Sequence, residues 1–278
     1  MAPRNPSTED DKIGPTAHYT AYVWHRLGFP HADRFVTPLG RALFWGFRAA
    51  GEGLLTYAPF APSMTQYLEY RHRAFESVVE DDRPDVVVEL GAGLSRRGVT
   101  WASRGVRYVE VDLPPMIRAK QRMIAERADR ALLEAIRGRL EHVSVDILSD
   151  AFPDQLASLL DGAARPVVMT EGVLSYFAPA DRRKLARSVA AALAGRGAFV
   201  GEMRVKQPAG AGAAALKTLR GATRLVTRGR GQGMEEESHE AARQALLDAG
   251  FTDVQPVEPS RWPHLARWPL PARVWVAR

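Results

Sequence analysis

From residue 85 to the end of the chain, short apolar runs alternate with longer amphipathic segments. The short runs predict strands, because about four to eight apolar residues bounded by turn residues suit a buried strand. Strands are expected at 86–90, 106–112, 142–146, 167–170, 198–202, 251–256 and 273–277. The amphipathic segments predict helices at 98–104, 115–128, 152–160, 179–194 and 235–249. Strands that alternate with helices pair in parallel, so the pattern predicts an α/β protein with a doubly wound, mostly parallel sheet of seven strands.

The N-terminal region lacks this alternation. Residues 12–70 are rich in Tyr, Trp and Phe, and Gly or Pro interrupts them at 28–30, 38–40 and 59–62. Such punctuation favours several short helices over strands. We expect the segment to fold over a ligand site as an N-terminal helical cap, although its aromatic side chains could equally serve to attach it to the core.

A basic segment follows the fifth predicted strand. Residues 204–234 contain no acid and several glycines, so an insertion is expected there. The next helix has an acidic first turn, which the helix dipole favours, and Gly250 ends it. A single domain is expected to cover the whole chain. Its expected parts are a cap, a core, the insertion and a C-terminal helix with the last strands, at 12–70, 85–203, 204–234 and 235–278.

Composition sets broad limits. The 278 residues carry a formal net charge of +6, and a basic surface attracts acidic ligands or, less readily, nucleic acid. An arginine-rich composition alone also produces such a basic surface. The chain has no cysteine, which excludes disulfides and thiolate-bound metals, and its seven histidines form no metal-ligand pattern. We therefore expect no metal.

The sequence shows no signal for a membrane. It has no run of about 18 apolar residues that could span a bilayer. Residues 1–11 lack the apolar stretch of a secretory signal. A cytoplasmic protein is the expectation, and its oligomeric state stays open.

The first predicted strand runs into a glycine-rich turn. Glu89 is followed by Gly91, Ala92 and Gly93, and the second strand ends in Asp112, about 20 residues on. Glycine permits a sharp bend and a close approach of the backbone to a ligand, which a Cβ would block. A carboxylate at the second strand end can accept hydrogen bonds from both hydroxyls of a ribose. The pattern predicts a nucleoside site, for a dinucleotide or for S-adenosylmethionine.

The residues around the turn favour S-adenosylmethionine. A dinucleotide turn reads G-x-G-x-x-G, whereas Leu94, Ser95 and Arg96 follow the second glycine here. The acid before the first glycine, Glu89, suits a cationic sulfonium. An NAD(P)-dependent oxidoreductase is the alternative from another class, although the chain has no Tyr-x-x-x-Lys pair.

Acids follow or end three further predicted strands. Open α/β sheets bind ligands at the carboxyl ends of their strands, so these acids are expected close together. Asp112 and its neighbour Leu113 are expected at the ribose. Asp146 is expected at the adenine amino group, with Ile147 covering the ring. Glu171 is expected beside the amino-acid part of the cofactor, near the glycine turn.

Three motifs in combination resemble the leucine carboxyl methyltransferase family. They are E-L-G-A-G-L-S-R-R-G at 89–98, V-E-V-D-L-P at 109–114 and T-E-G-V-L-S-Y-F at 170–177. Two more, P-T-A-H-Y-T-A-Y-V-W at 15–24 and Y-R-H-R-A-F-E at 70–76, resemble the branch of the tetracenomycin polyketide O-methyltransferase. The resemblance covers most of the first 200 residues. It implies a Rossmann-like class I methyltransferase that uses S-adenosylmethionine.

The resemblance also implies residue roles. Arg71 would hold the cofactor carboxylate through its guanidinium, and Glu171 would contact the amino group. The ribose and adenine acids keep the roles given above. Lys12 is a loose match to a lysine that also reaches the carboxylate. Many relatives have D-T-R where this chain has Ser95-Arg96-Arg97, so the role of these arginines is left open.

Methyl transfer from a sulfonium is an in-line displacement, so the protein mainly aligns the acceptor and excludes water. A carboxylate acceptor is ionised at neutral pH and needs no base. A hydroxyl needs one, for which His18, His72 and Tyr176 are weak candidates. Tyr19, Tyr22 and again Tyr176 are the expected substrate contacts. We expect an O-methyltransferase acting on a small molecule, at a carboxylate or hydroxyl of a polyketide-like or other secondary metabolite.

A macromolecular acceptor is the other alternative. The enzyme could methylate a protein C-terminal carboxylate, with the basic 204–234 segment as the docking surface. Binding would then weaken steeply with salt. The aromatic N-terminal region suits a small planar acceptor better, so this alternative ranks lower.

Overall fold

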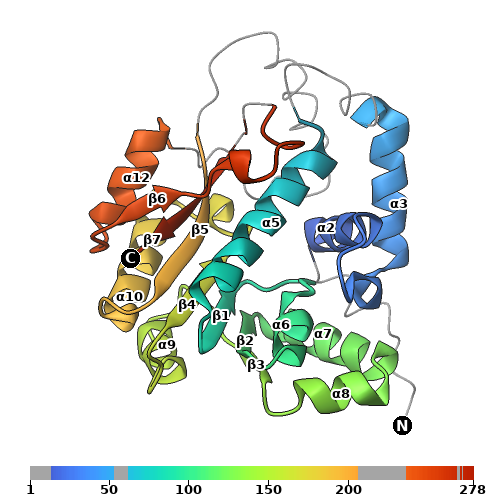
Figure 1. The fold of residues 1–278 in the computed structure, drawn as a ribbon, viewed down its shortest axis with the longest axis horizontal. Coiled ribbons are helices and arrows are strands. Elements are labelled where there is room, and N and C mark those ends of the chain that lie inside the picture. Colours follow the sequence, from blue (N-terminus) through green and yellow to red (C-terminus); the bar gives the residue numbers. More distant parts are fainter. Residues whose placement is uncertain (1–13, 53–61, 206–235, 268–269, 271) are drawn as a thin grey trace.

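The computed structural model describes residues 14–52, 62–205, 236–267, 270 and 272–278 (Figure 1). Within these ranges seven strands form one sheet. They are β1 (Val86–Leu90), β2 (Arg107–Asp112), β3 (Leu140–Ser144), β4 (Pro166–Thr170), β5 (Ala198–Arg204), β6 (Val254–Pro256) and β7 (Ala272–Ala277).

The strand order is β3-β2-β1-β4-β5-β7-β6. β7 is antiparallel to both β5 and β6, and the other neighbours are parallel. This confirms the predicted doubly wound, mostly parallel sheet. The order changes direction between β1 and β4, which is the switch point where an open α/β sheet binds its ligand.

Helices cover both faces of the sheet (Figure 1). They are α2 (Pro15–Arg26), α3 (Pro38–Phe47), α5 (Met64–Asp82), α6 (Arg97–Ser103), α7 (Pro114–Arg127), α8 (Arg130–Ile136), α9 (Phe152–Leu159), α10 (Pro179–Leu193) and α12 (His239–Leu247). Short 3-10 or π turns are η1 (Ala32–Phe35), η2 (Arg48–Glu52), η3 (Leu174–Tyr176) and η4 (Pro259–Arg261). Because side chains alternate along β1, Val87 packs with α5 and α6, while Val86 and Val88 pack with α9, α10 and α12.

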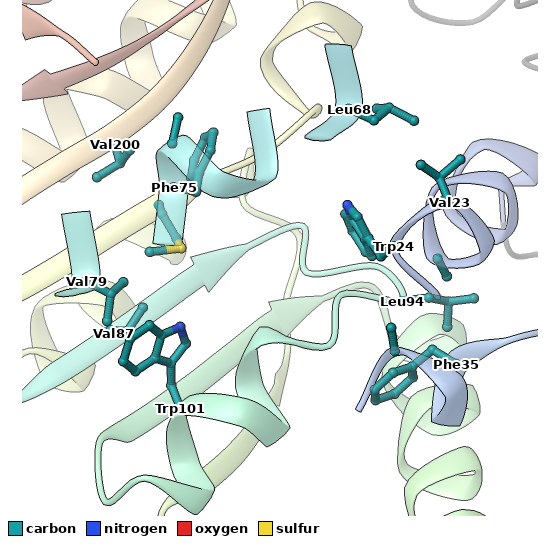
Figure 2. Packing of buried hydrophobic residues seen from close by; sticks show 14 of the residues in the cluster. Val23, Trp24, Phe35, Leu68, Phe75, Val79, Val87, Leu94, Trp101 and Val200 are labelled. Carbon is teal, nitrogen blue, oxygen red and sulfur yellow. The ribbon is translucent and has the colours of Figure 1, made fainter. Parts of the chain in front are cut away.

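The N-terminal helices share the core of the α5 and α6 side. Figure 2 shows Val23 and Trp24 of α2 and Phe35 of η1 near Leu68 of α5 and Leu94 after β1, and all five are buried. Burial of such side chains contributes about 1.5–3 kcal/mol each. The N-terminal segment is therefore held to the sheet by the main hydrophobic core.

Helix α5 is longer than the short helices expected before residue 70. It spans 19 residues, and the expected boundary between cap and core falls inside it. A capping box starts the helix: Gln66 N donates to Ser63 Oγ at 3.2 Å, and Ser63 N donates to Gln66 Oε1 at 2.9 Å. The S-x-x-Q motif of this capping box is visible in the sequence. The Gly and Pro residues just before the motif led to the prediction of short helices instead.

Other elements also differ from expectation, among them β6, which begins at Val254 instead of at 251. Strand β3 begins two residues earlier than the predicted 142–146, because Leu140 pairs with Tyr108 of β2. Helix α8 was not predicted at all. Its N-cap is Asp129, whose side chain accepts a hydrogen bond from Leu132 N at 2.9 Å. Seven residues give too short a window for the helical period to stand out.

Parts of the predictions lie outside the described residues. Lys12 does, and so does almost all of the 204–234 insertion, of which the end of β5 is described. Helix α12 starts at His239 instead of 235, because Ser238 caps it by accepting from Ala241 N at 3.1 Å.

Gly98 of α6 offers a test of the packing against β2. An added Cβ would lie 2.1 Å from Glu110 Oε1, a buried carboxylate held at 2.7 Å by Lys120 Nζ. We expect Gly98→Ala to lower the free energy of unfolding by about 1–3 kcal/mol, because the buried pair cannot move aside. Urea unfolding would measure this.

The matched control is Gly46→Ala in α3, where nothing lies within 4 Å of the new Cβ. Alanine is the better helix former, so this variant should gain about 0.5–1 kcal/mol. Equal effects of the two substitutions would contradict the assigned packing of Gly98.

Candidate cofactor site

The glycine turn after β1 folds back onto β2. Gly91 N and Ala92 N both donate to Val111 O, at 2.8 and 3.2 Å. Gly91 and Gly93 have φ of +67° and +52°, a region that disfavours side chains. A Cβ on Gly91 would lie 2.5 Å from Val173 Cγ2, so the turn also needs glycine for close packing against the loop after β4.

Asp112 stands beside this turn at the end of β2. Its Oδ2 accepts from Gly93 N and its Oδ1 from Leu113 N, each at 2.7 Å. Burial raises the pKa of Asp112, and these two backbone donors only partly offset that effect. The structure thus brings Asp112 and the glycine turn together, with Leu113 exposed next to them.

Asp146 and Ile147 follow β3 at the same edge. Asp146 is exposed, and its Oδ1 accepts from Leu148 N at 2.9 Å. Ile147 is buried in the core on the α9 side. The two residues thus lie side by side at this edge, and their contacts with adenine stay a prediction.

Glu171, directly after β4, lies against Arg71 of α5. Arg71 Nε donates to Glu171 Oε1 at 2.7 Å, and Arg71 Nη1 lies 3.2 Å from Glu202 Oε2. Gly172 N also donates to Glu202 Oε2, at 3.2 Å. Glu202 was missed as a site residue, although the rule that selected the other strand-end acids applies equally to the fifth predicted strand.

Arg97, the first residue of α6, links two of the acids. Its Nη1 pairs with Glu171 and its Nη2 with Glu89, and the guanidinium is completely buried. Glu89 also accepts from Tyr108 OH at 2.7 Å. Both oxygens of Glu89 are therefore used inside the protein, and its side chain is buried beneath the glycine turn.

These contacts form one continuous buried row, in which hydrogen-bond donors and carboxylates alternate. Its members are Tyr108, Glu89, Arg97, Glu171, Arg71, Glu202 and Tyr67, whose hydroxyl donates to Glu202. Burial alone raises the pKa of a carboxyl, but Arg97 and Arg71 reverse this and hold the pKa of Glu171 well below its ordinary value.

His72 lies against the row and has no exposed surface. Arg96 Nε donates to His72 Nε2 at 3.1 Å, and His72 Nδ1 lies 2.9 Å from Arg97 Nη1 and 3.3 Å from Glu171 Oε2. Burial, with the nearby Arg97, lowers the pKa of His72 to about 4. The ring is thus neutral and engaged on both nitrogens, which is the geometry of a residue that supports Glu171.

The other candidate bases and substrate contacts lie on or near α2. His18, Tyr19 and Tyr22 are buried, and Tyr19 and Tyr22 pack against Phe44 of α3. His18 Nδ1 lies 2.9 Å from Thr37 Oγ1, the N-cap of α3. These contacts give the three side chains a role in joining α2 to α3.

Tyr176 is the exposed member of the predicted set. It belongs to η3, after β4, and its hydroxyl lies 3.2 Å from Thr16 Oγ1 in the first turn of α2. The next residue of α2 is Ala17, whose Cβ is 3.7 Å from the position that a Cβ on Gly93 would occupy. The start of α2 therefore borders both the glycine turn and the loop that carries Glu171 and Tyr176.

Three solved structures with a similar fold are described as methyltransferases. A predicted methyltransferase from Thermobifida fusca matches with a TM-score of 0.61 at 14% identity, over 100% of this chain and 99% of that chain. The S-adenosylmethionine-dependent methyltransferase SibL, without ligand, matches with 0.52 at 18%, over 97% and 71%. A predicted O-methyltransferase from Nostoc punctiforme matches with 0.51 at 14%, over 84% and 68%. At such identities the matches show the fold alone, that of an α/β methyltransferase.

The chain belongs to the leucine carboxyl methyltransferase family, whose model matches residues 30–190. No curated protein matches the chain. Family and fold together identify an S-adenosylmethionine-dependent methyltransferase, and they decide against the oxidoreductase alternative.

The residues present fit this cofactor. The turn has two left-handed glycines and an adjacent carboxylate, Asp112, which suits a nucleoside held without a phosphate. In the described part of the chain, no cluster of three or more His, Asp or Glu residues could hold a metal ion. No described helix has both the length and the apolar character needed to cross a membrane.

Asp112 provides the first test of the site. We expect Asp112→Asn to weaken S-adenosylmethionine binding by about 1.5–3 kcal/mol, because hydrogen bonds to a charged acceptor are worth that much. Titration calorimetry would measure the affinity. As a control, Asp150→Asn removes an exposed carboxylate that Lys184 binds at 2.7 Å, and it should leave the affinity unchanged. Unchanged affinity in Asp112→Asn would refute the placement of the ribose.

His72 predicts a pH dependence of stability. Its pKa is about 4 in the folded protein and about 6.5 when unfolded, so the unfolded state binds the extra proton between these values. Stability should therefore fall by roughly 3 kcal/mol from this residue as the pH drops from about 6.5 to about 4. Urea unfolding across this range should show a shallower pH slope for His72→Asn than for wild type. The exposed His25→Asn should keep the wild-type slope, and equal slopes for all three would contradict the assignment.

Proposed function

We propose that the protein transfers the methyl group of S-adenosylmethionine to an oxygen of a small-molecule acceptor, and that this oxygen belongs to a carboxylate. The observation that carries the proposal is the state of the candidate bases. His18 and His72 are buried and hydrogen bonded within the fold. Tyr176 is exposed, but a phenol is a weak base at neutral pH. A carboxylate needs no base, so this arrangement suits it.

The family description points the same way, since it names a carboxyl group. A hydroxyl acidic enough to ionise near neutral pH, as in a polyketide phenol, is the second acceptor compatible with these residues. Kinship with the polyketide branch rests on the motifs at 15–24 and 70–76 and stays a prediction. Methylation of a protein C-terminus stays the alternative, and most of the basic segment invoked for it lies outside the described residues.

We assign the cofactor contacts as follows. Asp112 binds the ribose hydroxyls, and Asp146 with Ile147 binds the adenine. The methionine part lies along Gly91, Ala92 and Gly93 and ends at Arg71. Because Arg71 Nε and Nη1 already face Glu171 and Glu202, Nη2 is the guanidinium nitrogen assigned to the cofactor carboxylate.

An acceptor screen tests this proposal. Purified protein with methyl-labelled S-adenosylmethionine is given matched pairs of aromatic acids and phenols, and the labelled product is identified by mass spectrometry. We expect labelled methyl esters. For a carboxylate acceptor kcat/KM should be flat from about pH 6 to about pH 9, because the acceptor stays ionised. For a phenol it would rise with pH up to the phenol pKa.

Label found on phenol ethers with a rising pH profile would replace the carboxylate by a hydroxyl acceptor. Label found only on nitrogen would overturn the proposal of O-methylation. Transfer to a C-terminal peptide in preference to every small acid would establish the protein alternative.

A further inference from the structure

We infer that Arg97 is a positioning residue for the methionine end of the cofactor site, because its guanidinium bridges Glu89 under the glycine turn and Glu171 after β4. The inference rests on the proposed location of the cofactor. Arg97 itself is fully buried and would not touch the cofactor. Its effect passes through Glu171 and, beyond Glu171, through Arg71.

The position of Arg97 is fixed by the turn itself. It lies four residues after Gly93 and begins α6, and its backbone N donates to Ser95 Oγ at 3.2 Å. The guanidinium also lies 5.4 Å from the Phe75 ring centroid, which holds its plane on the α5 side. The turn that receives the cofactor and the acid expected at its amino group are thus connected through one side chain.

Only an arginine fits this place. Two nitrogens, Nη1 and Nη2, reach two different carboxylates at once. A lysine has one compact ammonium and cannot bridge both in the same plane. Arg97→Lys should therefore keep the positive charge but lose the bridge between Glu89 and Glu171.

Removal of the charge has a specific consequence. The charged and titratable groups that face Arg97 and Glu171 come from five elements. They are Arg71, His72 and Glu76 on α5, Glu89 on β1, Arg96 on α6, Tyr108 on β2, and Glu202 and Arg204 on β5.

With Arg97 and Glu171 included, four arginines balance four glutamates, and His72 is neutral. Loss of Arg97 leaves one buried carboxylate in excess, which takes up a proton far more readily than an exposed one. The pH dependence of cofactor affinity should then differ from that of wild type, in which the α-amino group of the cofactor itself titrates at about pH 8.

The experiment compares wild type, Arg97→Lys, Arg97→Gln and the double variant Arg97→Gln/Glu89→Gln. Calorimetry gives the Kd for S-adenosylmethionine from about pH 6 to about pH 9, and thermal unfolding gives stability. We expect Arg97→Gln to weaken binding roughly 100-fold with a new pH dependence. Arg97→Lys should lie between Arg97→Gln and wild type. The double variant should recover at least about tenfold of the affinity and lose the pH dependence, because the excess carboxylate is gone.

The matched control is Arg107→Gln, which removes a half-exposed arginine paired with Glu141 at 2.8 Å. It should leave both affinity and pH profile unchanged. If Arg97→Gln fails to fold, Arg97→Lys and the double variant still decide the question. A Kd within about twofold of wild type at every pH tested, in a folded Arg97 variant, would overturn the inference. Lower thermal stability with such a Kd would assign Arg97 a purely structural role and would equally overturn it.

Failure of the site assignment gives a different result. If Asp112→Asn binds the cofactor as well as wild type, the proposed location is wrong. If Asp112→Asn loses binding while the Arg97 variants keep it, only the role of Arg97 is wrong.

Discussion

The carboxyl edge of the sheet depends on the buried row of alternating donors and carboxylates. An ionised carboxylate removed from water costs several kcal/mol unless it is paired and hydrogen bonded. Each carboxylate of the row lies between two donors, and the row joins β1, β2, β5 and the residue after β4 to α5 and α6 at one level of the structure. The elements that surround the proposed cofactor site are thereby held in register by charge, in addition to the apolar packing on both faces. This also explains why α5, which precedes the sheet in sequence, is part of the site: it supplies Arg71 and His72 from a helix anchored at Tyr67 and Phe75 in the core.

The surroundings of the buried row also determine the charge states of Glu171 and His72. Glu171 stays ionised because Arg97 and Arg71 stabilise its charge, and His72 stays neutral because burial and the nearby Arg97 disfavour a positive charge on the ring. The charge of Glu171 and the neutrality of His72 are thus both set by the buried surroundings. In the proposed site, neither of these two groups changes its protonation state near neutral pH. Chemistry that requires no protein base is compatible with such an arrangement, since the reaction then demands alignment and exclusion of water.

Local sequence patterns predict some features of this fold and site and miss others. Apolar runs located all seven strands, and β1 agrees to the residue, because a run between turn residues is a local signal. The glycine turn and Asp112 are also recognised from local patterns, because both lie at strand ends. In the structure Gly93 N donates a hydrogen bond to Asp112 Oδ2. The contacts of the buried row could not be predicted from local sequence patterns, because the partners are far apart in the chain. Arg71 and Glu171 are 100 positions apart, and Arg97 and Glu171 are 74 apart. Such pairs depend on which helix covers which strand, and that is a property of the completed fold.

The start of α2 suggests where the acceptor approaches in the proposed arrangement. The adenosine would lie toward exposed Leu113 and Asp146, and the methionine part would lie toward the buried row. The methyl group would then lie beside the glycine turn, which Ala17 borders, and beside the loop that carries Val173 and Tyr176. We therefore expect the acceptor to approach near the contact between Thr16 Oγ1 and Tyr176 OH, which borders this turn and this loop. The side chains of Thr16 and Tyr176 carry hydroxyls, which can orient an acceptor carboxylate through hydrogen bonds without protonating it.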